Sequence, residues 1–557
     1  MSIPGVTRRR VAQWGSALRI GLLAVGVSLP GGAGAASAVL DYLNGVRERA
    51  GLGPLAEQAQ LAAAAGNHAA YLEPLSPAEP GSRGLAIHAE NPGMRGFTGE
   101  DPGQRALAAG YLHSSVLENV SIGSGDGRDA VDSLMSAIYH RLAFLDLAVD
   151  ETGAAQQGDV HVFLMGRGDL RRLCASPPKS ALFKPAVVCG SWLVSSEFFS
   201  NLCPDLPSRA HYESPFPVAC ANGRRLSAEY MDAFCRRPPR EALLEGGGRY
   251  YSLCDQNHRV RASWFDNLCK ANLMTAAYNH DGRYYEVCDP PVRVHAQWLE
   301  ERCAEAPSAA RLDAPPAKVA FCQPEFGLSK AYLDELDYSR KANQPAYVQW
   351  PPPGGRGISP VFYEETPDPL PDLSVSGYPV SLQFNPTYTT EPRVNSFKLE
   401  KDTPEGWQRV APVRLLSKRN DPQKILDEYE WVLFPLERLD WGSRYRVTVE
   451  GHWQNRPQRI EWEFRTRELP GPIFEVPLQA TSVQIPYNQI FYLSLERETD
   501  GESKAEHIRV TYPNGLRVKL EPIDAETLEV EISGRGCRAV NLFLGGGRRL
   551  HLKPDPC

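Results

Sequence analysis

The chain has 557 residues, several times the length of a typical domain, so the sequence predicts several independent hydrophobic cores. With 47 Gly, 47 Pro, 42% apolar and 23% charged residues, it is typical of a turn-rich globular protein and excludes a helical bundle, a long coiled coil and a wholly disordered chain. The formal charge of -7 leaves no excess of basic residues to neutralise phosphates, which argues against a nucleic-acid partner.

The first 35 residues show the order of basic, apolar and small residues that is typical of a secretory signal peptide. Four arginines precede the apolar run Ile20–Leu29, and Pro30 breaks that run ahead of several small residues. The uncharged stretch Ile20–Leu40 is long enough to span a bilayer, but the Pro and Gly residues within it argue against a stable transmembrane anchor. We expect residues 1–35 to be removed and the protein to be exported, as a periplasmic, cell-surface or secreted protein.

Residues 36–170 have the pattern of an α/β module. Apolar residues at helical spacing predict a helix from Val39 that stops at Gly51, and an alanine-rich helix follows over Glu57–Leu72. A later helix is expected over Asp129–Phe144 and a strand over Val160–Met165.

Several short motifs in this module resemble the bacterial branch of the CAP superfamily, which comprises cysteine-rich secretory proteins, antigen 5 and pathogenesis-related 1 proteins. The resemblance rests on their order and spacing: Leu43-Asn44 to Leu55, His88, Arg105 to Tyr111, Glu118-Asn119, Leu134-Met135 and His140-Arg141. It covers about a quarter of the chain. It implies an α-β-α sandwich at the N-terminal end of a multidomain α+β protein.

By the same resemblance, His88, Glu118 and His140 line a cleft. Two imidazoles and a carboxylate can hold a divalent metal such as zinc with an open position, or can shuttle protons. The three residues lack the short HExxH spacing of a helical zinc site, and each is equally compatible with an ordinary hydrogen-bonded side chain. They are therefore candidates for a cleft or a metal site, without an assigned catalytic role.

Neighbouring polar residues are interpreted as structural. His161 shares a strand face with Phe163, which indicates a packed side chain. Glu90 is expected at the surface or behind the cleft, and His68 in the core or at the surface of its helix. Ser121 lacks the Gly-x-Ser-x-Gly pattern of a nucleophile.

Residues 171–340 hold ten of the twelve cysteines. From Cys220 to Cys322 the separations alternate between 15 and 19, which gives a 34-residue repeat. Each unit has the pattern of a hairpin, a cysteine, a short helix and a second cysteine. Asp281-Gly282 is expected to be the turn of one such hairpin.

These cysteines predict disulfides, because no Cys-x-x-Cys pair occurs and the signal peptide points to an oxidising compartment. Pairing within units would leave Cys174 and Cys322 over, whereas pairing each second cysteine with the first of the next unit uses all ten, although the sequence leaves connectivity open. The expected bridges are Cys174 to Cys189, Cys203 to Cys220, Cys235 to Cys254, Cys269 to Cys288, and Cys303 to Cys322. A further bridge is expected between Cys537 and Cys557.

The remaining residues are rich in β-strand patterns. A Pro-rich linker is expected over 341–374, a β-sandwich over 375–468 and a small β domain over 472–557. The stretch Gly377-Tyr378-Pro379-Val380 is similar to a β domain that accompanies bacterial CAP modules. Neither β segment clusters titratable groups, so both are interpreted as binding or spacing modules.

The leading functional expectation is an extracytoplasmic binding or interaction protein. Its partner would be a lipid or other small apolar ligand, as relatives imply, or an envelope polymer or another protein. One alternative is a metal-assisted hydrolase or peptidase that uses His88, Glu118 and His140. Another is a structural component of the cell envelope.

Overall fold

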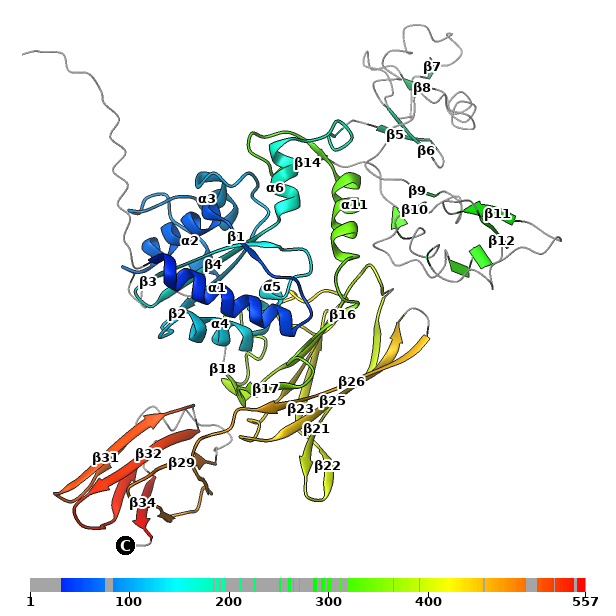
Figure 1. The fold of residues 1–557 in the computed structure, drawn as a ribbon. Helices are drawn as coiled ribbons and strands as arrows, with labels where there is room; N and C mark the ends of the chain where they lie inside the picture. The colour runs from blue at the N-terminus through cyan, green and yellow to red at the C-terminus, as the bar shows by residue number, and fades with distance from the viewer. Residues whose placement is uncertain are drawn as a thin grey trace, which may run out of the picture.

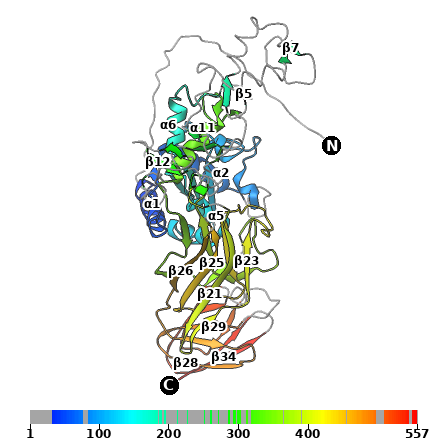
Figure 2. The same ribbon diagram turned by 90° about the vertical axis from the view of Figure 1, so that its right-hand side faces the viewer.

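The computed structural model describes residues 32–75, 84–183 and 318–555, apart from 364, 390, 454–455, 497–507, 525 and 545–547; between 184 and 317 it describes short strands and a few further residues. An α/β domain is followed along the long axis of the molecule by two β-rich domains (Figures 1 and 2). This confirms the expected mixed α+β organisation. No helix in the described ranges is long and apolar enough to cross a membrane.

The α/β domain is built around a four-stranded sheet with the strand order β1-β3-β4-β2. The strands are β1 (Ala56–Glu57), β2 (Leu117–Ile122), β3 (Glu151–Gln157) and β4 (Val160–Gly166). The helices are α1 (Gly32–Arg49), α2 (Ala59–Leu72), the 3-10 helix η2 (Gly84–His88), α3 (Pro102–Ala108), α4 (Gly127–Ser136), α5 (Ile138–Phe144) and α6 (Gly168–Ala175).

Helices cover both faces of this sheet. Because side chains alternate along a strand, Val162 and Leu164 of β4 pack in one apolar cluster with α2, whereas Phe163 and Met165 pack in another with α1 and α4. The domain therefore has three layers, α-β-α, as the family resemblance implies.

The helix expected over Asp129–Phe144 is divided into α4 and α5. Ala137 between them has an extended backbone, with φ -75° and ψ 120°, and supplies no side-chain cap to α5. The cap comes from a distant part of the chain. The Glu365 carboxylate accepts hydrogen bonds from the backbone N–H groups of Ile138, at 2.6 Å, and Tyr139, at 3.3 Å. This tertiary contact explains why local periodicity misses the break.

The first β-rich domain consists mainly of two sheets, with strand orders β16-β20-β24-β23 and β17-β26-β25-β21-β22. Its strands are β16 (Tyr347–Trp350), β17 (Gly355–Ile358), β18 (Val361–Tyr363), β19 (Val375–Gly377), β20 (Val380–Phe384), β21 (Arg393–Thr403), β22 (Gly406–Arg409), β23 (Val413–Ser417), β24 (Glu430–Pro435), β25 (Arg444–Trp453) and β26 (Arg456–Thr466). The segment 341–374, expected to be a linker, supplies β16, β17 and β18. The extended backbone that its prolines favour is used for pairing with β20, β26 and β19.

The second β-rich domain has two four-stranded sheets around one apolar cluster, with orders β27-β29-β32-β31 and β28-β34-β33-β30. Its strands are β27 (Ile473–Val476), β28 (Ser482–Ile485), β29 (Ile490–Leu495), β30 (Arg509–Thr511), β31 (Leu516–Pro522), β32 (Thr527–Gly534), β33 (Val540–Phe543) and β34 (Arg549–Pro554). Arg438 joins it to the first β-rich domain through hydrogen bonds to the Thr527 and Ser494 hydroxyls, at 2.6 and 2.8 Å. Cys537 is disulfide-bonded, and its expected partner Cys557 lies outside the described residues.

The described strands of the cysteine-rich region are short. They are β5 (Ala186–Cys189), β6 (Trp192–Ser195), β7 (His211–Tyr212), β8 (Arg225–Leu226), β9 (Tyr250–Tyr251), β10 (Arg259–Arg261), β11 (Tyr284–Val287), β12 (Val292–His295), β13 (Arg311–Leu312), β14 (Lys318–Val319) and β15 (Leu328–Ser329). The strand β11 pairs with β12 in an antiparallel hairpin, and the turn expected at Asp281-Gly282 lies outside the described residues. The 34-residue repeat itself lies largely outside the described residues.

Cys174 is bonded to Cys322, with 5.3 Å between the Cα atoms. The expected bridges from Cys174 to Cys189 and from Cys303 to Cys322 are therefore wrong. The physical reason is that the two ends of the cysteine-rich region lie side by side. Ser114 N–H donates to the Phe321 carbonyl at 2.9 Å, and Phe183 N–H donates to the Gly327 carbonyl at 2.9 Å. The helix α11 (Lys330–Lys341) then leads into β16.

Glu430 of β24 predicts a pH-dependent contribution to stability. Burial raises its pKa from the usual 4.5 to about 8, and the carboxylates of Asp427, Asp146 and Asp421 act in the same direction. The folded state therefore binds this proton more tightly than the unfolded state, and the resulting stabilisation is lost as pH rises from about 4.5 to about 8. Glu430→Gln should leave the free energy of unfolding nearly unchanged at pH 5 and raise it by roughly 1–3 kcal/mol at pH 8.5, as measured by urea denaturation.

A matched control for this experiment is Glu463→Gln, which changes an exposed carboxylate paired with an arginine. An equal effect of Glu430→Gln at both pH values would contradict the prediction.

Candidate functional site

His88 and Glu118, two of the expected cleft residues, are in direct contact. His88 ends η2 and is partly exposed, whereas Glu118 on β2 is buried; His88 Nδ1 lies 3.0 Å from Glu118 Oε1. Arg105 of α3 approaches the same carboxylate, with Nη2 2.8 Å from both oxygens. Its guanidinium also donates to the His88 carbonyl at 3.1 Å. Arg105 therefore fixes the carboxylate and the backbone of His88 together.

A second ion pair lies behind the first. His68 of α2 is fully buried, with Nδ1 2.8 Å from Glu90 Oε1 and Nε2 2.7 Å from the Ile87 carbonyl oxygen. Both partners are acceptors, so His68 satisfies both contacts only as a doubly protonated imidazolium. Its positive charge and that of Arg105 balance the negative charges of Glu90 and Glu118.

Glu90 also orders the loop that follows it. Its carboxylate accepts from the backbone N–H groups of Thr98, at 2.6 Å, and Gly99, at 3.3 Å. Burial alone would raise the pKa of Glu90, but the hydrogen bonds from His68 and Thr98 outweigh it and the pKa is lowered. The carboxylate is therefore held in its charged form, and residues 90–99 form a loop closed on a buried ion.

His140 does not join this cluster through its side chain. Its Nδ1 lies 2.9 Å from Glu365 Oε2 of the first β-rich domain. The connection to the cluster is through the backbone, because Asn119, the neighbour of Glu118, donates from Nδ2 to the His140 carbonyl at 2.9 Å. The structure thus brings His88 and Glu118 together and assigns the His140 side chain to a different carboxylate.

The cluster does not fit a resident metal ion. Both Glu118 oxygens are within hydrogen-bond distance of the Arg105 guanidinium, a cation that occupies the position a metal would need. Across the described parts of the chain, no group of three or more His, Cys, Asp or Glu side chains is arranged to hold a metal ion. The arrangement is a network of buried charges that balance one another and hold His88, its partly exposed member, in place.

Apolar side chains are exposed beside this network. Met94 and Phe97 are 41% and 36% exposed, and both lie on the loop that Glu90 closes. Tyr71 holds the loop in place through its hydroxyl, which accepts a hydrogen bond from Asn91 N–H at 2.8 Å and donates one to Met94 Sδ at 3.3 Å. We name Met94 and Phe97 the apolar rim.

The remaining expectations for this module have mixed outcomes. His161 is buried on β4, which confirms that it packs in the strand. Ser121 Oγ shares a hydrogen bond with Ser124 Oγ at 2.7 Å. Sequence analysis missed the pairing of His68 with Glu90; the available signal was one histidine on an otherwise apolar helix face. It also missed Glu365, for which no local signal exists.

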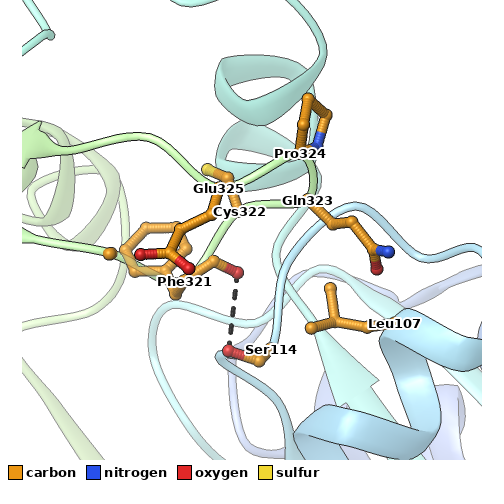
Figure 3. Close-up of a pocket in the computed structure, with 8 residues that line it drawn as sticks. Leu107, Ser114, Phe321, Cys322, Gln323, Pro324 and Glu325 are labelled. Carbon is orange, nitrogen blue, oxygen red and sulfur yellow. Dashed lines mark hydrogen bonds between the residues drawn. The ribbon is translucent and has the colours of Figure 1, made fainter.

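A hollow lies elsewhere, between α3 with the loop after it and the chain that follows the cysteine-rich region. It has a volume of about 750 Å³ and is lined by Leu107, Ser114 and residues 320–325. Ser114 Oγ donates to the Phe321 carbonyl at one side of it (Figure 3). None of His88, Glu118 and His140 lines it.

The sequence profile of the cysteine-rich secretory protein family, CAP, matches residues 40–159. Residues 40–159 form a CAP domain. The match begins within α1, ends just after β3, and includes His68, His88, Glu118 and His140. The family resemblance is thereby confirmed for this part of the chain.

Two solved bacterial structures are similar to the chain. One is an extracellular protein containing an SCP domain from Bacillus anthracis str. Ames, with 19% identity and a TM-score of 0.21; the alignment covers 24% of this chain and 41% of that one. The other is a cysteine-rich secretory protein from Staphylococcus aureus subsp. aureus Mu50, with 17% identity and a TM-score of 0.19. That alignment covers 25% of this chain and 40% of the other. The chain thus spans less than half the length of either protein. No curated protein matches it.

Proposed function

We propose that the protein is an exported binding protein whose CAP domain holds an amphiphilic, largely apolar ligand such as a lipid against the apolar rim and His88. The observation that carries the proposal is the contrast between the two sides of one loop. Its inner side is closed on Glu90, whose charge His68 and Arg105 help to balance, and its outer side exposes Met94 and Phe97. A rigid loop with exposed apolar side chains favours binding over catalysis.

His88 supplies the polar contact of this proposed surface. Its Nδ1–H donates to Glu118, so Nε2 is directed away from that carboxylate and can accept a hydrogen bond from a hydroxyl or amide. A ligand with one polar group and an apolar chain would satisfy both His88 and the rim. An envelope polymer or a protein remains the alternative partner that the sequence allows.

The rim can be tested by removing its apolar side chains. The double variant Met94→Ser, Phe97→Ser should weaken binding of the fluorescent fatty acid 11-(dansylamino)undecanoic acid about tenfold or more, because two apolar side chains no longer cover the probe. The measurement is a fluorescence titration of the full chain.

The matched control replaces two side chains of similar exposure in the second β-rich domain, Ile473→Ser and Ile490→Ser, which are 36% and 43% exposed in the unchanged chain. It should retain the affinity of the unchanged protein. Absence of probe binding by the unchanged protein, or equal losses in both double variants, would contradict the proposal.

The metal-assisted alternative can be tested separately. Zinc titration of the full chain by calorimetry should give the same result for the unchanged protein and for His88→Ala, His140→Ala, because the Arg105 guanidinium engages both oxygens of Glu118, the carboxylate that a metal would use. A stoichiometric site that disappears in the double variant would restore the hydrolase or peptidase hypothesis.

A further inference from the structure

Glu365 belongs to the first β-rich domain and yet makes all its described contacts with the CAP domain. It is 8% exposed, and its carboxylate accepts from Ile138 N–H, Tyr139 N–H and His140 Nδ1. Three donors from consecutive residues converge on one buried side chain. The carboxylate thus replaces the cap that Ala137 lacks.

This contact determines the direction of α5. Without a cap at residue 138, the apolar periodicity of residues 129–144 favours one continuous helix. The break at Ala137 places the His140 carbonyl where Asn119 Nδ2 donates to it, at 2.9 Å. Asn119 is almost fully buried and precedes Val120 on β2, the strand that carries Glu118.

The same carboxylate selects the tautomer of His140. A carboxylate is an acceptor, so His140 Nδ1 carries a hydrogen and, in the neutral ring, Nε2 carries the lone pair. His88 has the same arrangement towards Glu118. Both of these CAP-domain histidines thus donate from Nδ1–H to a carboxylate. The acceptor of His88 is Glu118 of the same domain, and that of His140 is Glu365 of the neighbouring domain.

We propose that Glu365 is a positioning residue for the CAP domain's binding site: it caps α5, fixes the His140 tautomer and, through Asn119, holds the strand that carries Glu118. The proposal rests on the function proposed above for its effect on ligand affinity. The binding site is then completed by the β-rich domain, and the isolated CAP domain lacks one of its supports.

The test compares Glu365→Gln with Asp421→Asn in the full chain. Asp421 is the matched control, because it also lies in the β-rich domain and accepts a hydrogen bond from α5, but from the Tyr139 hydroxyl and not from His140. Thermal unfolding first shows that both variants are folded. Nitrogen-15 NMR of the histidine rings then reports the His140 tautomer, and the dansyl fatty acid titration reports affinity.

We expect Glu365→Gln to change the His140 ring signals and to weaken probe binding by about three- to tenfold, with neither change in Asp421→Asn. Unchanged His140 signals in Glu365→Gln would overturn the proposal, as would changed signals with unchanged affinity. If the unchanged protein binds no probe, the proposed function fails, and the His140 signals alone decide whether Glu365 positions this residue.

Discussion

Replacing both Cys174 and Cys322 with serine should lower the free energy of unfolding by about 3–5 kcal/mol. The bridge joins residues 148 positions apart, and in the chain-entropy model a closed loop of that length restricts the unfolded chain by about 5 kcal/mol. Losses from native disulfides of small secreted domains reach a similar size. The measurement is urea denaturation followed by tryptophan fluorescence.

The fold around the bridge should survive its loss. Leu170, Leu173, Leu328 and Phe326 pack in the same apolar cluster as the two cysteines, and backbone hydrogen bonds join residues 112–114 to 321–323. We therefore expect the double serine variant to fold, with faster hydrogen exchange confined to α6 and α11 under native conditions. Peptide mapping of the unchanged protein without reduction should yield one linked peptide containing Cys174 and Cys322. Recovery of a Cys174 to Cys189 peptide would contradict the structure.

This bridge shows that cysteine spacing can reveal a repeat but does not determine which cysteines pair. Pairing within units leaves Cys174 and Cys322 over, which counts against that scheme only if these two cannot meet, and in the structure they are bonded to each other. Spacing carries no information on which distant segments meet. The two ends are adjacent because the chain before β2 pairs with the chain after the cysteine-rich region, a tertiary event.

The candidate site could also be predicted from the sequence only in part. The family resemblance selects His88 and Glu118, and the structure brings them into contact. The partner of His140 was out of reach because Glu365 is 225 residues away, in a Pro-rich segment that by composition resembles a linker. The charge of His68 could not be predicted from the sequence either, because only the structure shows that two hydrogen-bond acceptors face its ring.

The adjacent Arg141 also joins the CAP domain to the first β-rich domain. Its side chain is fully buried, and its guanidinium donates to the carbonyls of Met135, at 2.7 Å, and Pro379, at 2.8 Å, and to the Ser381 hydroxyl at 3.0 Å. It also lies over the Tyr378 ring, 5.0 Å from the ring centroid. Residues of both domains share one apolar cluster around this contact.

Arg141→Met should therefore destabilise the protein by about 3–5 kcal/mol, because it leaves buried carbonyls without donors on both sides of the junction. Arg141→Lys should recover only part of this, since one ammonium group does not reproduce the planar fork that reaches Met135 and Pro379 together. The measurement is again urea denaturation.

Arg444→Met is the control for Arg141→Met, because Arg444 also lies over an aromatic ring, that of Trp407, but is 44% exposed and pairs with Glu463 at the surface. It should leave the free energy of unfolding nearly unchanged. Equal losses in the two methionine variants would show that the cost comes from removing an arginine from a ring and not from opening the junction. A large loss for Arg141→Met alone would mean that the His140-Arg141 motif, one of those that carry the family resemblance, also joins the two domains.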